Sequence, residues 1–370
     1  MSKTMPALLL AAGLATGGAA HAQDSERRVE VYGLGGWAYG NTDGNSYLGG
    51  IEEGNYNNAN TALNVTAEPG QRLHVTTQVE WRLEGSETET EVEIDFAFAE
   101  WRFSSAANLR VGKIKQPFGL STEVFDVGTL RPFYALPQAL YGPVGFVAEG
   151  YLGVGLTGER SFSGDWGLRY DAYVGAQIVE EYEAPEAVLF GEPLAGEGFH
   201  NETTRDLVGG RLTIDAPGGL NFGASGYSGK VHDSQRRDGW GLHAEYAPAG
   251  WSLRAELARE KTQEHSKRGG YVEIARRIGP HWQVAGQWGR LRTKVPAIET
   301  PFLPRLLEHD EWALGLNYWV TPAFVFKASF QHVQGNRLAA VEADELLEAI
   351  QEGELRAKTR LVLVGAQFSF

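Results

Sequence analysis

Residues 71–84 read QRLHVTTQVEWRLE, and their apolar and polar side chains alternate one by one. One face carries Leu73, Val75, Thr77, Val79, Trp81 and Leu83, and the other carries His74, Thr76, Gln78, Glu80, Arg82 and Glu84. Such alternation is typical of a β-strand with one apolar and one polar face. Its length suits a tilted strand that crosses a lipid bilayer. Residues 164–177 and 322–333 repeat the pattern.

The connections between such segments alternate between short and long. Turns rich in Pro, Gly or Ser lie at 69–70, 104–105, 163–164, 217–219, 248–250, 279–280 and 321–322. Mostly longer polar connections lie at 40–59, 85–90, 115–148, 178–203, 229–237, 261–267, 293–309 and 335–357. Together these connections join about sixteen strands, with short turns on one side and long loops on the other.

The pattern predicts an all-β protein, a closed antiparallel transmembrane β-barrel. An unpaired backbone N–H or C=O in hydrocarbon costs several kcal/mol, so an open sheet edge is excluded. We therefore expect the strand near Val29 to pair with the last strand, leaving no edge. The apolar face then meets outer-membrane lipid, and the polar face lines the interior.

Both chain ends agree with export to an outer membrane. Lys3, the apolar residues 7–20 and the sequence Ala20-His21-Ala22 predict a signal peptide over 1–22, which leaves 23–370 as the barrel domain. The last strand, 359–370 (TRLVLVGAQFSF), ends on a terminal aromatic residue. With Phe368 and Phe370 on one face, it resembles the targeting strand that the barrel assembly machinery reads.

Tryptophans gather beside the short turns. Trp166, Trp251 and Trp282 follow such turns, and Trp101 and Trp319 precede them. Amphipathic rings are favoured at the membrane–water interface, so we expect these residues to form a ring there.

A barrel of sixteen strands is too wide for its own side chains to fill, so it encloses water. By strand parity, the basic residues of the pore wall are Arg82, Arg169, Arg211, Arg254 and Lys327. By the same rule, the acidic residues are Glu80, Glu91, Glu93, Asp95, Asp171, Glu245 and Glu256. The interior therefore carries both signs of charge. The chain as a whole is acidic, with 33 basic and 47 acidic residues, which argues against a nucleic-acid partner.

The third long connection differs from the others in composition. Residues 115–148 (KQPFGLSTEVFDVGTLRPFYALPQALYGPVGFVA) carry many large apolar and aromatic side chains that need burial. Folding this loop into the barrel would bury them against the wall and narrow the channel. The constriction would then be lined by Lys113, Lys115, Glu123, Asp126 and Arg131. Packing on the outer rim, or on a neighbouring subunit, is the alternative.

Residues 109–120 (LRVGKIKQPFGL), with the Phe-, Tyr- and Pro-rich stretch to Tyr141, resemble the strand and inserted loop of phosphate-selective porins of the O and P type and their relatives. The local match covers about thirty residues. The resemblance implies a homotrimer of sixteen-stranded barrels in the bacterial outer membrane, each with an infolded third loop. Phosphate selectivity in that family rests on a dense ladder of arginine and lysine, whereas the wall inferred here is mixed.

These observations predict passive diffusion of small polar or charged solutes, with selectivity set by pore width and fixed charge. An anion- or phosphate-selective pore, and a structural or adhesive barrel without channel activity, are the alternatives. We expect no enzyme, no cofactor and no metal. His332 shares the outward parity of Phe330 whereas Ser329 faces inward, so the pair cannot form a hydrolase site. The sequence of residues 338–350 predicts a short helix at the mouth of the barrel, and partner binding by this helix is the alternative.

Overall fold

The computed structural model describes residues 28–83, 90–124, 126–142, 145–182, 199–231, 235–263, 265–294, 305, 307–339 and 355–370. The predicted signal peptide (1–22) and nearly all of the predicted helix 338–350 lie outside these ranges. Within them, no helix is both long enough and apolar enough to span a membrane.

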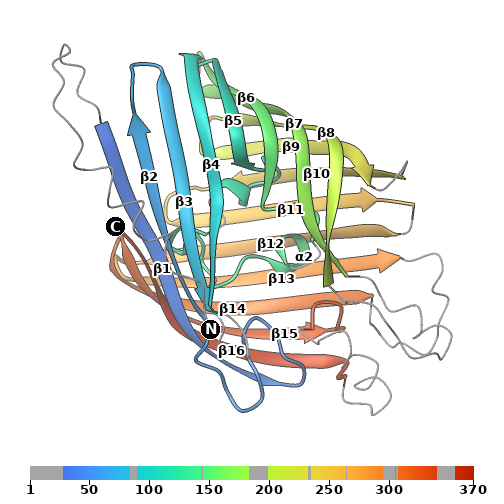
Figure 1. Cartoon of the computed structure of the whole chain (residues 1–370). Helices are drawn as coiled ribbons and strands as arrows, with labels where there is room; N and C mark the ends of the chain where they lie inside the picture. The colour runs from blue at the N-terminus through green and yellow to red at the C-terminus, as the bar shows by residue number, and fades with distance from the viewer. Residues whose placement is uncertain are drawn as a thin grey trace, which may run out of the picture.

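The described chain forms one closed barrel in which each strand pairs with its neighbours in sequence, antiparallel throughout (Figure 1). The strands are β1 (Arg28–Asp43), β2 (Ala59–Glu68), β3 (Leu73–Leu83), β4 (Glu91–Ser104), β5 (Ala107–Lys115), β6 (Gly150–Phe162), β7 (Trp166–Tyr182), β8 (Phe199–Ala216), β9 (Leu220–Val231), β10 (Gln235–Tyr246), β11 (Trp251–Lys261), β12 (Ser266–Ile278), β13 (Trp282–Lys294), β14 (Glu308–Thr321), β15 (Phe324–Gln334) and β16 (Lys358–Ser369). The predicted barrel of sixteen strands is confirmed, and every predicted turn falls between two strands.

The barrel closes where β1 pairs with β16. The backbones of Gly33 and Phe370 exchange two hydrogen bonds, at 2.9 and 2.8 Å between nitrogen and oxygen. Glycines on β1 leave room at this seam for the phenylalanine rings of β16. A Cβ added to Gly33 would run into the Phe370 ring, and one added to Gly35 would lie 2.9 Å from the Phe368 ring. The two terminal strands therefore fit each other closely.

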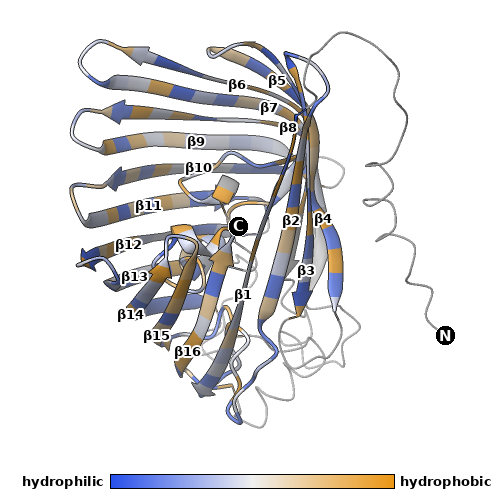
Figure 2. Ribbon diagram, turned by 90° about the vertical axis from the view of Figure 1, so that its left-hand side faces the viewer, coloured by the Kyte–Doolittle hydropathy of each residue, from blue (hydrophilic) through white to orange (hydrophobic). Residues whose placement is uncertain are grey.

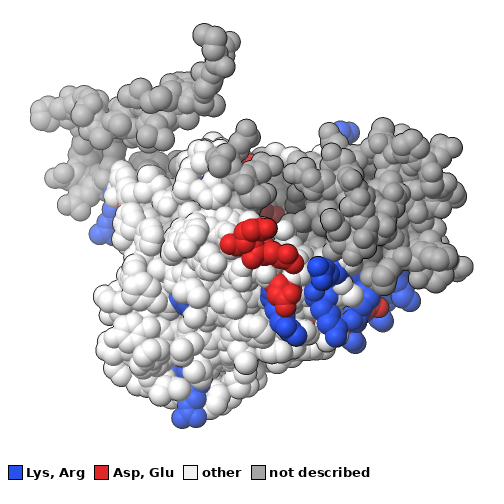
Figure 3. Space-filling model, turned by 90° about the horizontal axis from the view of Figure 1, so that it is seen from below, with Lys and Arg blue, Asp and Glu red and all other residues white. Residues whose placement is uncertain are grey.

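Alternation places the apolar and polar faces as predicted. On β15, Ala328 pairs with Leu316 and Val364, which are both exposed on the outer face. Its neighbours Lys327 and Ser329 are buried on the inner face. Apolar and polar bands alternate along the strands in Figure 2, and Figure 3 shows a broad area of outer surface without charged side chains. The outer face is therefore suited to lipid.

The tryptophan pattern holds for four of the five predicted positions. Trp101, Trp166, Trp251 and Trp282 are exposed, but Trp319 is buried. Trp319 pairs with the inward-facing Val325, so its parity points it into the barrel. Tyr318 takes the outer position instead and meets the Trp282 ring edge-on, with centroids 5.0 Å apart. Proximity to a turn was the wrong criterion, because parity decides which face a residue occupies.

Candidate functional site

The loop between β5 and β6 folds against the inner face of the barrel, as its apolar composition predicts. Its elements are η2 (Thr122–Val124), η3 (Gly128–Leu130) and α2 (Gln138–Tyr141). Helix α2 packs against β11 to β14, and η3 packs against β16 and β1, all inside the ring of strands (Figure 1). The buried apolar side chains of the described part of the loop include Phe118, Phe133, Tyr134, Leu136, Ala139, Leu140, Tyr141, Phe146 and Ala148.

Not every large side chain of the loop is buried. Val124 and Leu130, which were expected to pack, are 37% and 56% exposed, and Phe125 lies outside the described residues. A loop that lies along the barrel wall buries only the face that contacts the wall. Its other face remains open, so the loop presents apolar as well as charged side chains to the lumen.

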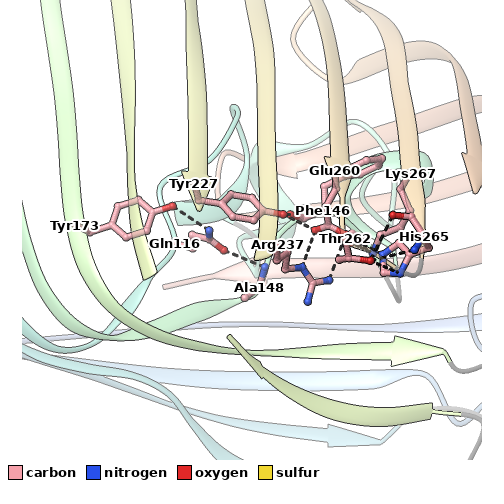
Figure 4. Close-up of polar contacts among 11 residues, drawn as sticks. Gln116, Phe146, Ala148, Tyr173, Tyr227, Arg237, Glu260, Thr262, His265 and Lys267 are labelled. Atoms are coloured by element: carbon pink, nitrogen blue, oxygen red, sulfur yellow. Dashed lines mark hydrogen bonds and ion pairs between the residues drawn. The ribbon is translucent and has the colours of Figure 1, made fainter. Parts of the chain in front are cut away.

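The two limbs of the loop are tied together at the wall. The side-chain amide of Gln116 donates to the Tyr173 hydroxyl at 2.9 Å. Its side-chain oxygen accepts from the backbone N–H of Ala148 at 3.0 Å (Figure 4). One buried glutamine thus joins the start of the loop, its end and β7. Because Gln116 is fully buried, these bonds escape competition from water.

Glu260 of β11 is the centre of a second attachment (Figure 4). Its carboxylate accepts from Arg237 Nε at 2.9 Å and pairs with Lys267 Nζ at 2.9 Å. Lys267 also donates to the Gly145 carbonyl oxygen at 3.0 Å. The Tyr227 hydroxyl lies 2.6 Å from the Phe146 carbonyl oxygen and 2.5 Å from Glu260. A buried ion-pair network therefore holds the returning limb of the loop.

A third attachment joins the middle of the loop to β11 and β12. The hydroxyls of Tyr141 and Tyr271 donate to Glu256 Oε1 at 2.8 and 2.6 Å, and the backbone N–H of Leu120 donates to Glu256 Oε2 at 3.0 Å. Burial, reinforced by the Glu256 carboxylate, raises the pKa of Tyr141 well above its ordinary value. The tyrosine therefore stays protonated and remains a hydrogen-bond donor.

Carboxylates gather where the loop leaves β5. One carboxylate oxygen from each of four residues lies within 4.8 Å of the others, and these residues are Glu80, Asp95, Asp126 and Glu149. Lys115 Nζ lies among them, 2.5 Å from Asp95 and 3.1 Å from both Asp126 and Glu149. Arg82 adds ion pairs to Glu80 at 3.0 Å and to Glu149 at 3.5 Å. The spacing would suit a metal ion, but amino-acid cations occupy the cluster, so it acts as an ion-pair network.

Asp126 brings the tip of the loop into this carboxylate cluster. Its Oδ2 accepts from the Gln78 side-chain amide at 3.0 Å, in addition to its pair with Lys115. Burial works to raise the pKa of Asp126, but the Lys115 ammonium, hydrogen bonds with Asp95 and Lys115 and the charge of Arg82 together hold that pKa below its ordinary value. Asp126 is therefore a charged contact between the loop and the wall at neutral pH.

The arginines of the wall are paired with carboxylates on the same strand or on a neighbouring one. Arg169 Nη2 lies 2.8 Å from Asp215, and Arg211 Nη2 lies 2.9 Å from Asp171. Further pairs join Arg254 to Glu245 and Glu273, and Arg102 and Arg110 to Glu100. Arg211 Nη1 also donates to the Gly119 carbonyl oxygen of the loop at 3.2 Å. In these pairs, five arginines meet five carboxylates, so the wall carries little net charge where they lie.

The structure places the predicted constriction residues in four different ways. Lys115 and Asp126 lie together in the carboxylate cluster, 3.1 Å apart. Lys113 does not lie there, because it pairs in register with Leu152, which is 57% exposed on the outer face. The Lys113 ammonium donates to the exposed Ile94 carbonyl oxygen at 2.6 Å. The side chain of Glu123 lies outside the described part of the structure. Arg131 is half-buried, and its carbonyl faces β15.

The predicted wall needs two corrections. Lys327 is buried beneath the loop, where its ammonium meets backbone carbonyls, so it does not line open water. Arg82 faces inward, but its guanidinium is paired within the carboxylate cluster beside Asp126. Glu149, the residue before β6, was missed. Its only sequence signal is an acid at the end of the apolar loop.

A closed barrel with an apolar outer face, a charged lumen and an inserted loop defines a diffusion channel of the outer membrane. A profile of the Gram-negative porin family matches residues 7–345, so the chain belongs to that family. It is therefore a porin of the bacterial outer membrane, a channel for small solutes. No curated protein sequence matches the chain.

Solved structures of outer-membrane channels share the fold. The anion-selective porin of Comamonas acidovorans aligns with a TM-score of 0.55 at 13% identity, over 93% of this chain and all of its own. OmpF of Salmonella typhi, in a complex with daunomycin, aligns with a TM-score of 0.59 at 12% identity, over 93% of this chain and 98% of its own. The channel DcaP of Acinetobacter baumannii reaches 0.56 at 11% identity, over 95% and 100%. At these identities the likeness concerns the fold alone.

Proposed function

We propose that residues 116–149 form the constriction of a general diffusion pore, and that the pore discriminates weakly between anions and cations. The pairing of the wall charges carries this proposal. An arginine that already has a carboxylate partner attracts a passing anion less strongly than a free one, because the fields of the two charges largely cancel.

The remaining asymmetry lies between a part of the lumen with an excess of carboxylates and a part where arginines and carboxylates are paired. The carboxylate cluster lies on β3, β4 and the loop, and the arginine pairs with Asp171, Asp215, Glu245 and Glu273 lie on β7, β8 and β10 to β12. A field across a narrow pore orients dipolar solutes and passes small ions of either sign. The likeness to phosphate-selective O and P porins therefore extends, in our proposal, to the architecture and not to the substrate.

Reversal potentials under a salt gradient test the proposal. Wild-type channels in planar bilayers should reverse close to zero. Glu93→Gln with Glu149→Gln removes two half-exposed acids beside Arg82 and should shift the reversal potential toward anion preference. Arg169→Gln with Asp215→Asn removes a whole ion pair and leaves the net charge unchanged. This double variant is the control, and we expect no shift of its reversal potential. A strongly anion-selective wild type whose current inorganic phosphate blocks would overturn the proposal.

The proposal extends to the route and assembly of the protein. We propose that residues 1–22 are cleaved on export, that the assembly machinery reads Phe368 and Phe370, and that the barrel works as a homotrimer without catalytic activity. A trimer form of the outer-membrane protein OmpT of Vibrio cholerae, whose fold aligns with a TM-score of 0.55 at 10% identity over 93% of this chain and 99% of its own, supports the trimer. Family membership supports the absence of catalysis.

A further inference from the structure

Lys327 meets the loop in a way that its sequence position does not reveal. Its ammonium donates to three backbone carbonyl oxygens, those of Gly128 at 2.7 Å, Arg131 at 2.7 Å and Phe133 at 3.0 Å. A lysine ammonium carries three N–H groups, so these three bonds use all of its donors. The residue is only 3% exposed, so its ammonium contacts the loop and does not face the water of the pore.

The strands on either side of Lys327 add donors to the same stretch of loop. Asn317 of β14 donates its side-chain amide to the Pro132 carbonyl oxygen at 2.7 Å. Gln367 of β16 donates to the Tyr134 carbonyl oxygen at 3.2 Å. Three adjacent strands thus each present one donor to residues 128–134. Lys327 occupies the central strand and makes the largest number of these bonds.

This stretch depends on the wall for its position. Only η3 gives it regular structure, and η3 is a single short turn. Buried carbonyl groups need partners, and a charged donor forms stronger hydrogen bonds than a neutral one. Without the ammonium, three carbonyls would lose their common partner at once, and solvation by water would require the loop to move away from β15.

We infer that Lys327 is a positioning residue for the constriction. It holds residues 128–134 against β14 to β16 and thereby sets the width and steadiness of the open pore. The inference rests on the proposed function of the loop, and it assigns a separate role to one residue of the wall. It also separates Lys327 from the paired wall arginines, whose charges face the lumen.

Single-channel recording of Lys327→Met tests the inference. Methionine keeps an unbranched side chain but has no donor. We expect a change in mean conductance larger than the spread among wild-type channels, with broader current fluctuations, while the reversal potential stays at the wild-type value. Lys230→Met is the matched control, because Lys230 is 55% exposed by its side chain and pairs with Asp206 away from the loop. It should leave conductance unchanged.

A disulfide provides a rescue that a purely structural defect would not allow. The hydroxyls of Thr129 and Ser369 lie 3.4 Å apart, and the chain has no cysteine of its own. Cysteines at these positions have side chains close enough to bond after a small shift. In the Lys327→Met background, oxidation of the Thr129→Cys, Ser369→Cys pair should return conductance and noise toward wild type, and reduction should undo this. Each single cysteine should show no redox response.

Other outcomes overturn the inference. Unchanged conductance and noise in a folded Lys327→Met barrel would show that the ammonium does not position the loop. A shift in reversal potential without a conductance change would make Lys327 an ordinary wall charge. If Lys327→Met does not fold, Asn317→Ala and Gln367→Ala carry the test, and wild-type currents in both would overturn it. The proposed function fails separately, if the wild-type protein gives no channels or if removal of the loop leaves conductance unchanged.

Discussion

Ala328 lies in the middle of β15 and faces outward between Leu316 and Val364. An arginine near the bilayer midplane of such a barrel costs about 2–4 kcal/mol. We therefore expect Ala328→Arg to lower the free energy of unfolding by roughly that amount, as measured by urea titration in lipid vesicles. Ala328→Leu, which adds bulk but no charge, should remain close to wild type. Equal losses in both variants would mean that the site does not face lipid.

Single residues also show which positions a sequence can predict and which contacts it cannot. Alternation predicts correctly that Ala328 faces outward and Lys327 inward. It could not predict that Lys327 binds carbonyls almost 200 positions earlier in the chain, because a backbone carbonyl has no sequence signature. Lys113 was assigned to the constriction only through its closeness to the loop. Its register with Leu152, which is exposed on the outer face, places it outside.

At the scale of the elements, the seam between β1 and β16 depends on small residues. A Cβ at Gly35 would lie 2.9 Å from the Phe368 ring of β16 and 2.6 Å from the Asn60 backbone oxygen, which cannot move without displacing β2. Gly35→Ala should therefore destabilise the barrel by about 1–3 kcal/mol, the usual cost of overpacking. Gly286 on β13 is the matched control, since a Cβ there would meet nothing closer than Ile274 at 3.8 Å.

The heat-modifiable mobility of the two barrels on gels measures the difference. We expect Gly35→Ala to unfold at a lower temperature than wild type and Gly286→Ala to equal or exceed wild type, because alanine loses less backbone entropy on folding than glycine. The same loss of stability in both variants would mean that glycine is needed throughout the strands and that the seam is not special.

The strands and the loop differ in how far their sequences predict them. Strand number and order follow from a period of two and from turn residues, which are local signals. The apolar composition of the loop predicts that it packs inside. Its attachments to Tyr173, Glu256, Glu260 and Lys327 follow from contacts between distant segments, which no local pattern encodes.

For the whole molecule, the acidic composition says little about the pore. The net charge of −14 includes residues outside the lumen, whereas the described lumen pairs many of its charges. Buried and paired charges contribute less to the field in a channel than free ones. The ion selectivity of the pore therefore depends on the geometry of the ion pairs, and neither the net charge of the chain nor the fold determines it.

The central claim is that the barrel is a water-filled pore narrowed by the loop between β5 and β6. Deleting residues 121–135 and joining the ends through a short glycine linker removes η2, η3 and the stretch that Lys327 holds, but keeps Gln116 and the Glu260 attachments. Single-channel conductance of this variant, measured beside wild type in planar bilayers, tests the claim most directly. We predict stepwise currents from both proteins and a larger step from the deletion variant. Equal steps from two folded barrels would place the narrowest part of the pore elsewhere and contradict the account.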